Sequence, residues 1–214
     1  MRISLIGPGD IEFHYTQLLG LSKKELEKEI QGIARALADS GAEIELLPDK
    51  GICIEIAKLY KQNKGEKVVG AVPKSDRTFG ISHLEQYIST EIDGKKLFEE
   101  IIDTGDWFKH DMIKGLMGNA ILYLGSSPGT DGERHYAVYL YKLIAGFKKG
   151  VDVSASSLHK EARAGKNFTI FVYSPFLKVG KLAEEDEAYM KKFNVNLVYL
   201  SSPEQLKKEL SRLI

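Results

Sequence analysis

Short apolar runs alternate with longer segments of amphipathic spacing along most of this chain. The apolar runs lie at residues 3–6, 44–47, 68–72, 120–124, 168–173 and 197–200. Short continuous runs of this kind are typical of strands that are buried on both faces of a sheet. The segments between them, with apolar residues at helical spacing, predict helices at residues 22–41, 52–60, 107–117, 133–147 and 184–193. A further short strand is predicted at residues 87–90. The pattern indicates an α/β fold with a mainly parallel sheet and helices on both faces.

Local end signals support the helix boundaries. Ser22 followed by Glu25 has the sequence pattern of a capping box, and Gly41 suits a helix C-terminus. Pro203 stands where proline is favoured, at the first position of a closing helix. Because no internal repeat or low-complexity linker interrupts the pattern, we expect residues 1–214 to form a single Rossmann-like nucleotide-binding domain, a three-layer sandwich. We interpret the polar residues 152–166 as a flexible excursion within it.

Composition narrows the classes of partner and the compartment. Lysine plus arginine number 30 and aspartate plus glutamate number 30, so the formal net charge is zero. A chain without net charge has no overall attraction to nucleic acid or to an anionic membrane, which disfavours both as partners. Cys53 is the only cysteine, which excludes an internal disulfide and favours a reducing compartment. No apolar stretch approaches the ~20 residues of a membrane-spanning helix, so we expect a cytoplasmic protein.

Three glycine-rich segments follow predicted strands and therefore mark one edge of the sheet. They are Gly7-Pro8-Gly9, Gly51, and the loop Gly125-Ser126-Ser127-Pro128-Gly129-Thr130. Ligands of open parallel sheets bind at the carboxyl ends of the strands. Backbone N–H groups of small residues can converge there on an anion, and the following helix adds the partial positive charge of its N-terminus. We therefore expect a phosphate-bearing small molecule, a nucleotide or sugar phosphate, to contact Gly7, Gly9, Gly51, Ser126, Ser127, Gly129 and Thr130. The alternative is that these loops are only tight turns.

Other chemistry-bearing residues give less specific signals. Glu133 beside the last loop could bind ribose hydroxyl groups or act as a general acid or base, or it could only complement the helix dipole. The five histidines show no metal-ligand spacing, so we predict neither a metal ion nor another cofactor. Cys53 lies among isoleucines and is interpreted as a core residue. Tyr136, Tyr139 and Tyr141 on one helix favour a core position or a homodimer face over a base-stacking surface.

Residues 118–133 resemble the signature of the Lonely Guy (LOG) family and its lysine-decarboxylase-labelled relatives. That signature is an apolar strand followed by P-G-G-x-G-T-x-x-E, and Gly129, Thr130 and Glu133 match it in spacing. The segment Gly125-Ser126-Ser127 stands where the proline and the first two glycines would be. Residues 51–57 resemble the family's G-L-M-x-A-V-A helix and residues 68–73 its V-I-G-V-I-P strand. Together these matches cover most of the chain from residue 1 to about residue 147.

The resemblance implies a Rossmann-like fold, often dimeric, that binds nucleotides or related phosphates. The best-characterised members hydrolyse the N-glycosidic bond of nucleoside 5′-monophosphates and release the base and ribose 5-phosphate. Carried over to this chain, the backbone around Gly129 and Thr130 would hold the phosphate. Glu133 would contact the ribose or assist hydrolysis, because a carboxylate stabilises the positive charge that develops on the sugar.

One position departs from the family pattern and separates three functional hypotheses. Active members carry an arginine in an R-K-x-x-M pattern, and counting back from Gly125 places His110 at that position, with Lys109 beside it. Neither side chain reproduces the bidentate geometry of a guanidinium group. The first hypothesis is therefore a nucleotide- or phosphoribosyl-binding protein. The second is an active phosphoribohydrolase in which Glu133 acts with Lys109 or His110. The third is a non-enzymatic interaction protein, which the retained motif residues disfavour.

Overall fold

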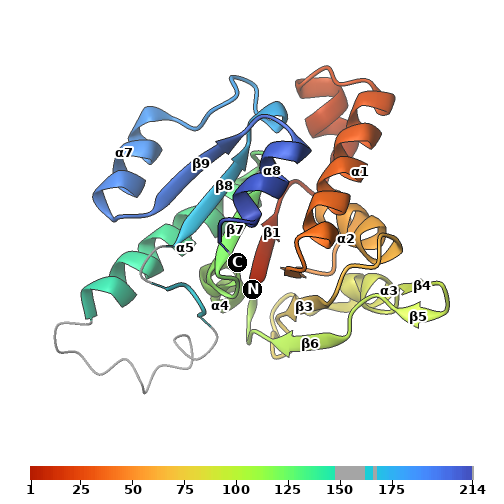
Figure 1. Cartoon of the computed structure of the whole chain (residues 1–214). Helices are drawn as coiled ribbons and strands as arrows, with labels where there is room; N and C mark the ends of the chain where they lie inside the picture. The colour runs from red at the N-terminus through yellow and green to blue at the C-terminus, as the bar shows by residue number, and fades with distance from the viewer. Residues whose placement is uncertain (148–161, 166–167, 214) are drawn as a thin grey trace.

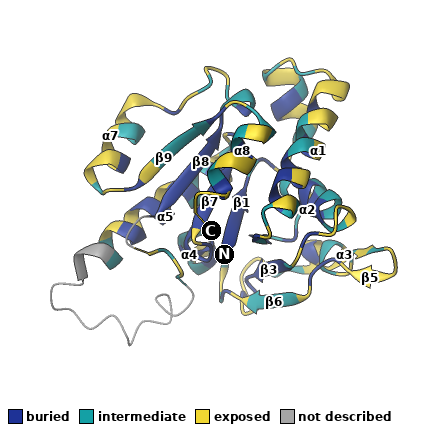
Figure 2. Cartoon of the chain, in the orientation of Figure 1, coloured by how far each residue is buried: buried dark blue, intermediate teal, exposed yellow. Residues whose placement is uncertain are grey.

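The computed structural model describes residues 1–147, 162–165 and 168–213. Within these residues seven strands form one parallel sheet: β1 (Arg2–Ile6), β2 (Glu43–Leu46), β3 (Val68–Val72), β6 (Glu100–Asp103), β7 (Ala120–Tyr123), β8 (Thr169–Tyr173) and β9 (Asn196–Leu200). Their order across the sheet is β6-β3-β2-β1-β7-β8-β9, and every neighbouring pair is parallel. The central strands are the most buried elements, shown dark blue in Figure 2. The predicted α/β class with a parallel sheet is confirmed.

Helices cover both faces of this sheet. On one face α1 (Lys23–Asp39), α2 (Ile52–Gln62) and α8 (Pro203–Leu210) share an apolar core with the sheet. On the other face α4 (Trp107–Ile113), α5 (Pro128–Phe147) and α7 (Glu184–Lys192) share a second core. Figure 1 shows the two groups of helices on either side of the central strands. The fold is therefore the expected Rossmann-like three-layer sandwich.

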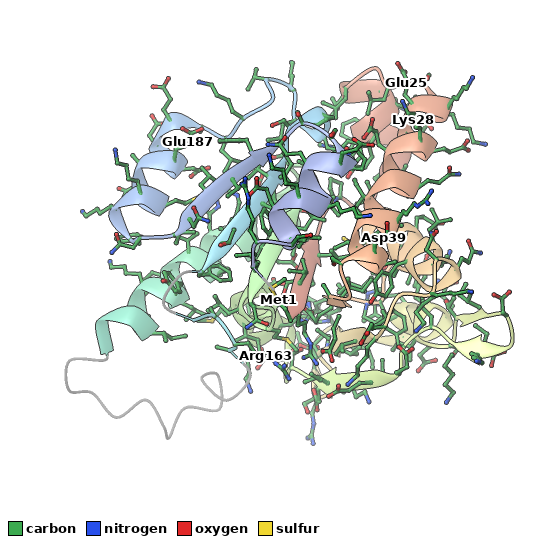
Figure 3. All side chains as sticks on the ribbon, viewed as in Figure 1. Met1, Glu25, Lys28, Asp39, Arg163 and Glu187 are labelled. Carbon is green, nitrogen blue, oxygen red and sulfur yellow. The ribbon has the colours of Figure 1, made fainter. Side chains whose placement is uncertain are left out.

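Helix α1 shows how the amphipathic pattern produces these layers. Ile30 and Ile33 face the core, whereas Glu25, Lys28 and Asp39 lie on the exposed side of the same helix (Figure 3). The capping box is present as predicted, because the Ser22 hydroxyl accepts the backbone N–H of Glu25 and the Glu25 carboxylate accepts that of Ser22. Local capping and the apolar stripe thus specify the same helix.

Helix α5 differs from its predicted bounds. It begins at Pro128, five residues before the predicted start at Glu133. Proline suits the first helical position because its fixed φ is helical and its missing N–H would have no partner there. The consequence for the site is that Gly129 and Thr130 belong to the first turn of a helix rather than to a preceding loop.

Shorter elements connect the layers. They are the π-helix η1 (Glu12–Leu18), the 3-10 helices η2 (Ser82–Leu84), η3 (Lys114–Leu116) and η4 (Ser174–Phe176), the helix α3 (Glu85–Ile88), and the hairpin β4 (Glu91–Ile92) with β5 (Lys95–Lys96). The strand predicted at residues 87–90 is wrong, because the first half of that segment belongs to α3, which ends at Ile88, and the second half is not in a strand. Asp93 and Gly94, with φ of 52° and 73°, form the two-residue turn that connects β4 to β5.

Two sequence predictions, the flexible segment and the absence of a membrane-spanning helix, can be compared only with the described residues. Of the predicted flexible excursion at residues 152–166, only residues 162–165 are described, so most of it lies outside the described part. In the described part of the chain, no helix has the length and apolar composition needed to cross a lipid bilayer.

Candidate functional site

The site lies where the chain changes direction across the sheet. β1 and β7 are hydrogen-bonded neighbours, but the segment after β1 leads to α1 on one face, and the segment after β7 leads to α5 on the other. Such a switch point opens a crevice at the carboxyl ends of the two strands. A cavity of about 160 Å³ occupies this crevice. Its lining comes from the ends of β1, β2 and β7 and from the helices α2, η3 and α5: Leu5, Gly7, Gly9, Leu47, Asp49, Lys50, Cys53, Lys114, Ser127, Gly129, Thr130 and Glu133.

Close backbone approach explains the glycines on the β1 side of the cavity. Gly51 has a φ of 121°, and a Cβ atom there would lie 2.6 Å from the Gly9 Cα and 2.6 Å from the Pro8 carbonyl oxygen. The next residue, Ile52, donates its backbone N–H to that carbonyl at 3.2 Å. Gly51 therefore holds the loop after β1 against the start of α2. The predicted contacts Gly7 and Gly9 line the cavity, whereas Gly51 does not line it and packs against the backbone of Pro8 and Gly9.

The first turn of α5 forms the opposite wall. The backbone N–H of Thr130 bonds the Ser127 hydroxyl at 3.3 Å, and the two side-chain oxygens lie 2.8 Å apart. The backbone N–H of Asp131 bonds the Ser127 carbonyl at 2.8 Å. The first N–H groups of a helix lack intrahelical acceptors. Pro128 has no backbone N–H, and those of Thr130 and Asp131 bond Ser127, so Gly129 contributes the remaining N–H of this turn. Gly129, Thr130 and Ser127 therefore line the cavity at a helix N-terminus.

A buried ammonium group forms the floor of the cavity. Lys114, in η3, is 2% exposed, and its Nζ donates to the Leu5 carbonyl at 2.8 Å and to Glu133 Oε2 at 3.2 Å. Burial lowers the pKa of Lys114, but the charges of Glu133 and Glu45 outweigh burial and raise it above its usual value. Burial raises the pKa of Glu133, and the Lys114 charge only partly offsets this. The floor thus holds a fixed positive charge beside a carboxyl group that takes up a proton more readily than an exposed glutamate.

A second carboxyl group lies beneath this pair. Glu45 on β2 is fully buried, and neither of its carboxylate oxygens has a hydrogen-bond partner among the described residues. Burial raises the pKa of Glu45 to about 7, although the nearby charge of Lys114 lowers it. The three groups Glu45, Lys114 and Glu133 therefore form one electrostatic unit in the sheet edge.

The structure brings only one of the two predicted partners of Glu133, His110 and Lys109, close to its carboxylate. His110 is fully buried, and its Nε2 lies 3.9 Å from Glu133 Oε1 while its Nδ1 lies 3.0 Å from the Thr104 hydroxyl. Burial and the Lys114 charge lower the pKa of His110 to about 3, so the imidazole is neutral. Lys109 does not line the cavity, and its side chain lies over Gly105. The structure thus brings His110 to Glu133 but puts Lys114, not Lys109, beside the carboxylate.

A larger hollow adjoins the cavity. It measures about 470 Å³ and shares Gly9 and Ser127 with the first cavity, while Ser126, Phe13 and His14 line its other side. The π-helix η1 supplies Phe13, which is 51% exposed, and His14. A Cβ atom at Gly125, whose φ is 133°, would lie 2.6 Å from the His14 Nε2, so glycine is needed at the head of the loop. The two hollows together can accept a ligand with a small anionic end and a larger ring.

Lys114 and Glu45 are not among the site residues predicted from the sequence. If His110 occupies the arginine position of the R-K-x-x-M pattern, the methionine position four residues later is Lys114, and this lysine among apolar neighbours was the available signal. Glu45 gave no signal, because a strand in which glutamate alternates with apolar residues normally exposes its polar face. Cys53 packs against the core as interpreted and also reaches the cavity, where burial raises its pKa to about 12.

The tyrosines of α5 divide between core and surface. Tyr141 is buried against the second core, whereas Tyr136 and Tyr139 are 45% and 49% exposed. The buried position confirms the core interpretation for Tyr141. For Tyr136 and Tyr139, the homodimer face remains a prediction.

Comparisons with known proteins give similar folds but no match in sequence. No family model matches the chain, and no curated protein sequence matches it. The molybdenum cofactor binding protein of Rippkaea orientalis has a similar structure, with a TM-score of 0.56 and 14% identity, over 99% of this chain and 96% of that one. The molybdenum cofactor carrier protein of Chlamydomonas reinhardtii has a TM-score of 0.58 and 15% identity over 99% and 96% of the two chains. The structural-genomics target TM1055 has a TM-score of 0.56 and 14% identity over 99% and 98%. At these identities the similarity shows that this chain has the Rossmann-like fold of these three proteins.

Proposed function

We propose that this protein binds a phosphate-bearing small molecule, a nucleotide or phosphoribosyl compound, in the cavity between β1 and α5. The observation that carries the proposal is the convergence of Gly7, Gly9, Ser127, Gly129 and Thr130 on one cavity at the topological switch point of the sheet. These residues come from segments more than a hundred positions apart, yet all of them line the same cavity. Tight turns alone would not require this convergence.

The electrostatics of the cavity suit an anion that is held mainly by dipoles. The N-terminus of α5 contributes a partial positive charge, and Lys50 and Lys114 contribute ammonium groups. Asp49 and Glu133 offset those full charges, so the cavity is not strongly basic. A phosphate would therefore depend on the Gly129 backbone N–H and on the partial positive charge of the helix N-terminus, which carry no counter-charge of their own.

The sizes of the two hollows favour a ligand with a ring as well as a phosphate. A cavity of about 160 Å³ accommodates a phosphate with part of a sugar, and the adjoining hollow of about 470 Å³ accommodates a base or similar ring beside Phe13. Two of the similar structures are named for binding or carrying the molybdenum cofactor. This supports a small-molecule ligand for the present chain as well.

A thermal-shift screen against nucleoside mono-, di- and triphosphates and ribose 5-phosphate tests the proposal. A tenfold excess of ligand over its Kd should add roughly 1.4 kcal/mol of stability. Gly129→Asp should abolish the shift, because its carboxylate would repel the phosphate, and a Cβ at Gly129 has no atom within 4 Å. Gly132→Asp is the matched control, since it adds the same charge to the same turn with equally free space but does not line the cavity.

Two results would contradict this assignment. If no phosphate compound stabilises the folded protein, the chain shares only the fold of ligand-binding relatives, and the interaction-protein hypothesis takes its place. If Gly132→Asp abolishes the shift as completely as Gly129→Asp, the ligand binds elsewhere on α5 or responds only to charge on this helix.

Glu133 supports a second candidate function, hydrolysis of the N-glycosidic bond of a nucleoside 5′-monophosphate. A buried carboxyl group with a raised pKa that lines a ligand cavity is suited to general acid or base catalysis. The test is release of free base from a stabilising nucleotide, followed by chromatography. Glu133→Gln should stop release while binding persists. Stabilisation without base release from any nucleoside monophosphate would leave binding as the function.

The proposal also includes a cytoplasmic location and a homodimer. A single cysteine favours a reducing compartment, and the exposed Tyr136 and Tyr139 suggest α5 as the contact face between two copies. Light scattering of the purified chain tests the dimer, and Tyr139→Lys should shift a dimer toward the monomer.

A further inference from the structure

We propose that His110, Asp111 and Glu133 form a binding site for a divalent transition-metal ion at the contact between α4 and α5. One ligand atom from each residue, an imidazole nitrogen and two carboxylate oxygens, lies within 4.8 Å of the other two. Metal–ligand distances for such donors are about 2.0–2.2 Å, so small rotations of the two carboxylates would close the set around one ion. The site extends beyond the proposed function, because it needs no phosphate ligand to form.

His110 provides the observation that points to an ion. Its ring is fully buried, and its Nε2 has no hydrogen-bond partner in the described part of the chain. The Thr104 hydroxyl at 3.0 Å from Nδ1 and the edge of Trp107 fix the ring in place. An unsatisfied buried nitrogen is costly, and a metal ion bound by the free Nε2 removes that cost. A hydrogen bond on the other ring nitrogen is also the usual way in which a metal-binding histidine is oriented.

Glu133 can serve the ion without giving up its contact to Lys114. The ammonium group of Lys114 bonds Oε2, whereas Oε1 is the atom that lies 3.9 Å from the His110 Nε2. The two oxygens of one carboxylate therefore face two different cations. Because Glu133 also lines the ligand cavity, a bound ion would lie on the wall of that cavity, next to the place assigned to the phosphate.

The charges and donor types indicate which ion would bind. Asp111 and Glu133 together bring two negative charges against one positive charge on Lys114, so a divalent cation finds a net attraction. One imidazole nitrogen with two carboxylate oxygens suits Zn²⁺ or Mn²⁺, whereas Mg²⁺ prefers oxygen ligands and retains its water. Three protein ligands leave positions for water or for a ligand oxygen.

Isothermal titration of the full chain, treated with a chelator and dialysed, tests the site with Zn²⁺, Mn²⁺ and Mg²⁺ in the absence of any phosphate compound. We expect one Zn²⁺ per chain, weaker binding of Mn²⁺, and no saturable binding of Mg²⁺. Asp111→Asn should weaken Zn²⁺ binding by about tenfold or more. It keeps the size of a partly exposed side chain, so the variant should fold. Bound Co²⁺ supplies a second readout, a visible absorption spectrum that should change in His110→Gln.

His135→Gln is the control, because His135 also pairs with a carboxylate, at 2.9 Å from Asp186, and is well exposed. Its Zn²⁺ affinity should equal that of the unmodified chain. The proposal is overturned if the folded chain binds no Zn²⁺, or if the affinity is unchanged in Asp111→Asn and Glu133→Gln. Loss of binding in His135→Gln alone would also overturn it, since the ion would then be held between α5 and α7.

Discussion

Glu45 offers the most direct test of the electrostatics beneath the cavity. Its carboxylate is fully buried on β2 and has no hydrogen-bond partner within the described residues. The ordinary pKa of glutamate is 4.5, whereas burial raises that of Glu45 to about 7. At every pH between these values the folded chain holds a proton that the unfolded chain has released. Stability therefore falls as the pH rises through this window, and the full cost is present above about pH 7.

The size of this cost follows from the two pKa values. Their difference corresponds to about 3 kcal/mol of unfolding free energy, since one pH unit corresponds to about 1.4 kcal/mol. Glu45→Gln replaces the carboxyl group by a neutral group of the same size. We therefore expect the variant to be more stable than the unmodified chain by about 3 kcal/mol near pH 8, and by only about 1 kcal/mol near pH 5. Lys114 keeps its bonds to Leu5 and Glu133 in this variant.

Urea denaturation followed by circular dichroism over this pH range measures the difference. Glu43→Gln is the matched control, because Glu43 lies two positions earlier on the same strand but pairs with Arg2 at 3.1 Å. That variant should lose stability rather than gain it. The reasoning is refuted if Glu45→Gln is less stable than the unmodified chain near pH 8. It is equally refuted if the gain is the same at both pH values, because burial of a charge would then not be its cause.

Two further variants, with Lys109→Met as a control, test the floor of the cavity and the glycine contact between the two loops by the same denaturation measurement. Lys114→Met leaves the Glu133 carboxylate buried without its counter-charge and should lower the free energy of unfolding by about 3–5 kcal/mol near neutral pH. Lys109→Met removes no ion pair found in the described residues and should change the free energy of unfolding by less than about 0.5 kcal/mol. Equal losses in the two lysine variants would contradict the floor. Gly51→Ala should lower the free energy of unfolding by about 2 kcal/mol or more, because its φ of 121° and the Gly9 backbone at 2.6 Å leave no room for a Cβ. A loss below about 0.5 kcal/mol would show that close packing of the two loops does not require glycine at this position.

The layers of the fold could be predicted because local sequence determines them. Buried strands such as β3 appear as continuous apolar runs, and α1 carries both its capping box and its apolar stripe within its own residues. The start of α5 is not evident from the sequence, because the glycine-rich stretch around Gly129 has the composition of a loop, although Pro128 suits the first helical position. The π-helix η1 was not predicted, since it has no regular apolar period of its own.

The site was only partly predictable for a different reason. Gly7, Gly9 and Gly129 could be assigned to one edge because parallel topology brings the ends of strands together. The pairing of Lys114 with Glu133 depends instead on how η3 packs against α5. The burial of the Glu45 side chain depends on which elements cover β2. Contacts of this kind come from tertiary packing, and the residue spacing along a single sequence does not reveal them.

The packing of α8 against α1 also affects how the chain folds as it is synthesised. A Cβ atom at Gly32 of α1 would lie 2.5 Å from the Pro203 ring of α8, and Lys207 of α8 pairs with Asp39 of α1 at 2.7 Å. Because α1 precedes α8 in the chain, α1 leaves the ribosome before the helix that covers one of its flanks. Until residues 203–210 emerge, a flank of α1 stays exposed to solvent, and a nascent chain stalled before that point would present it to chaperones.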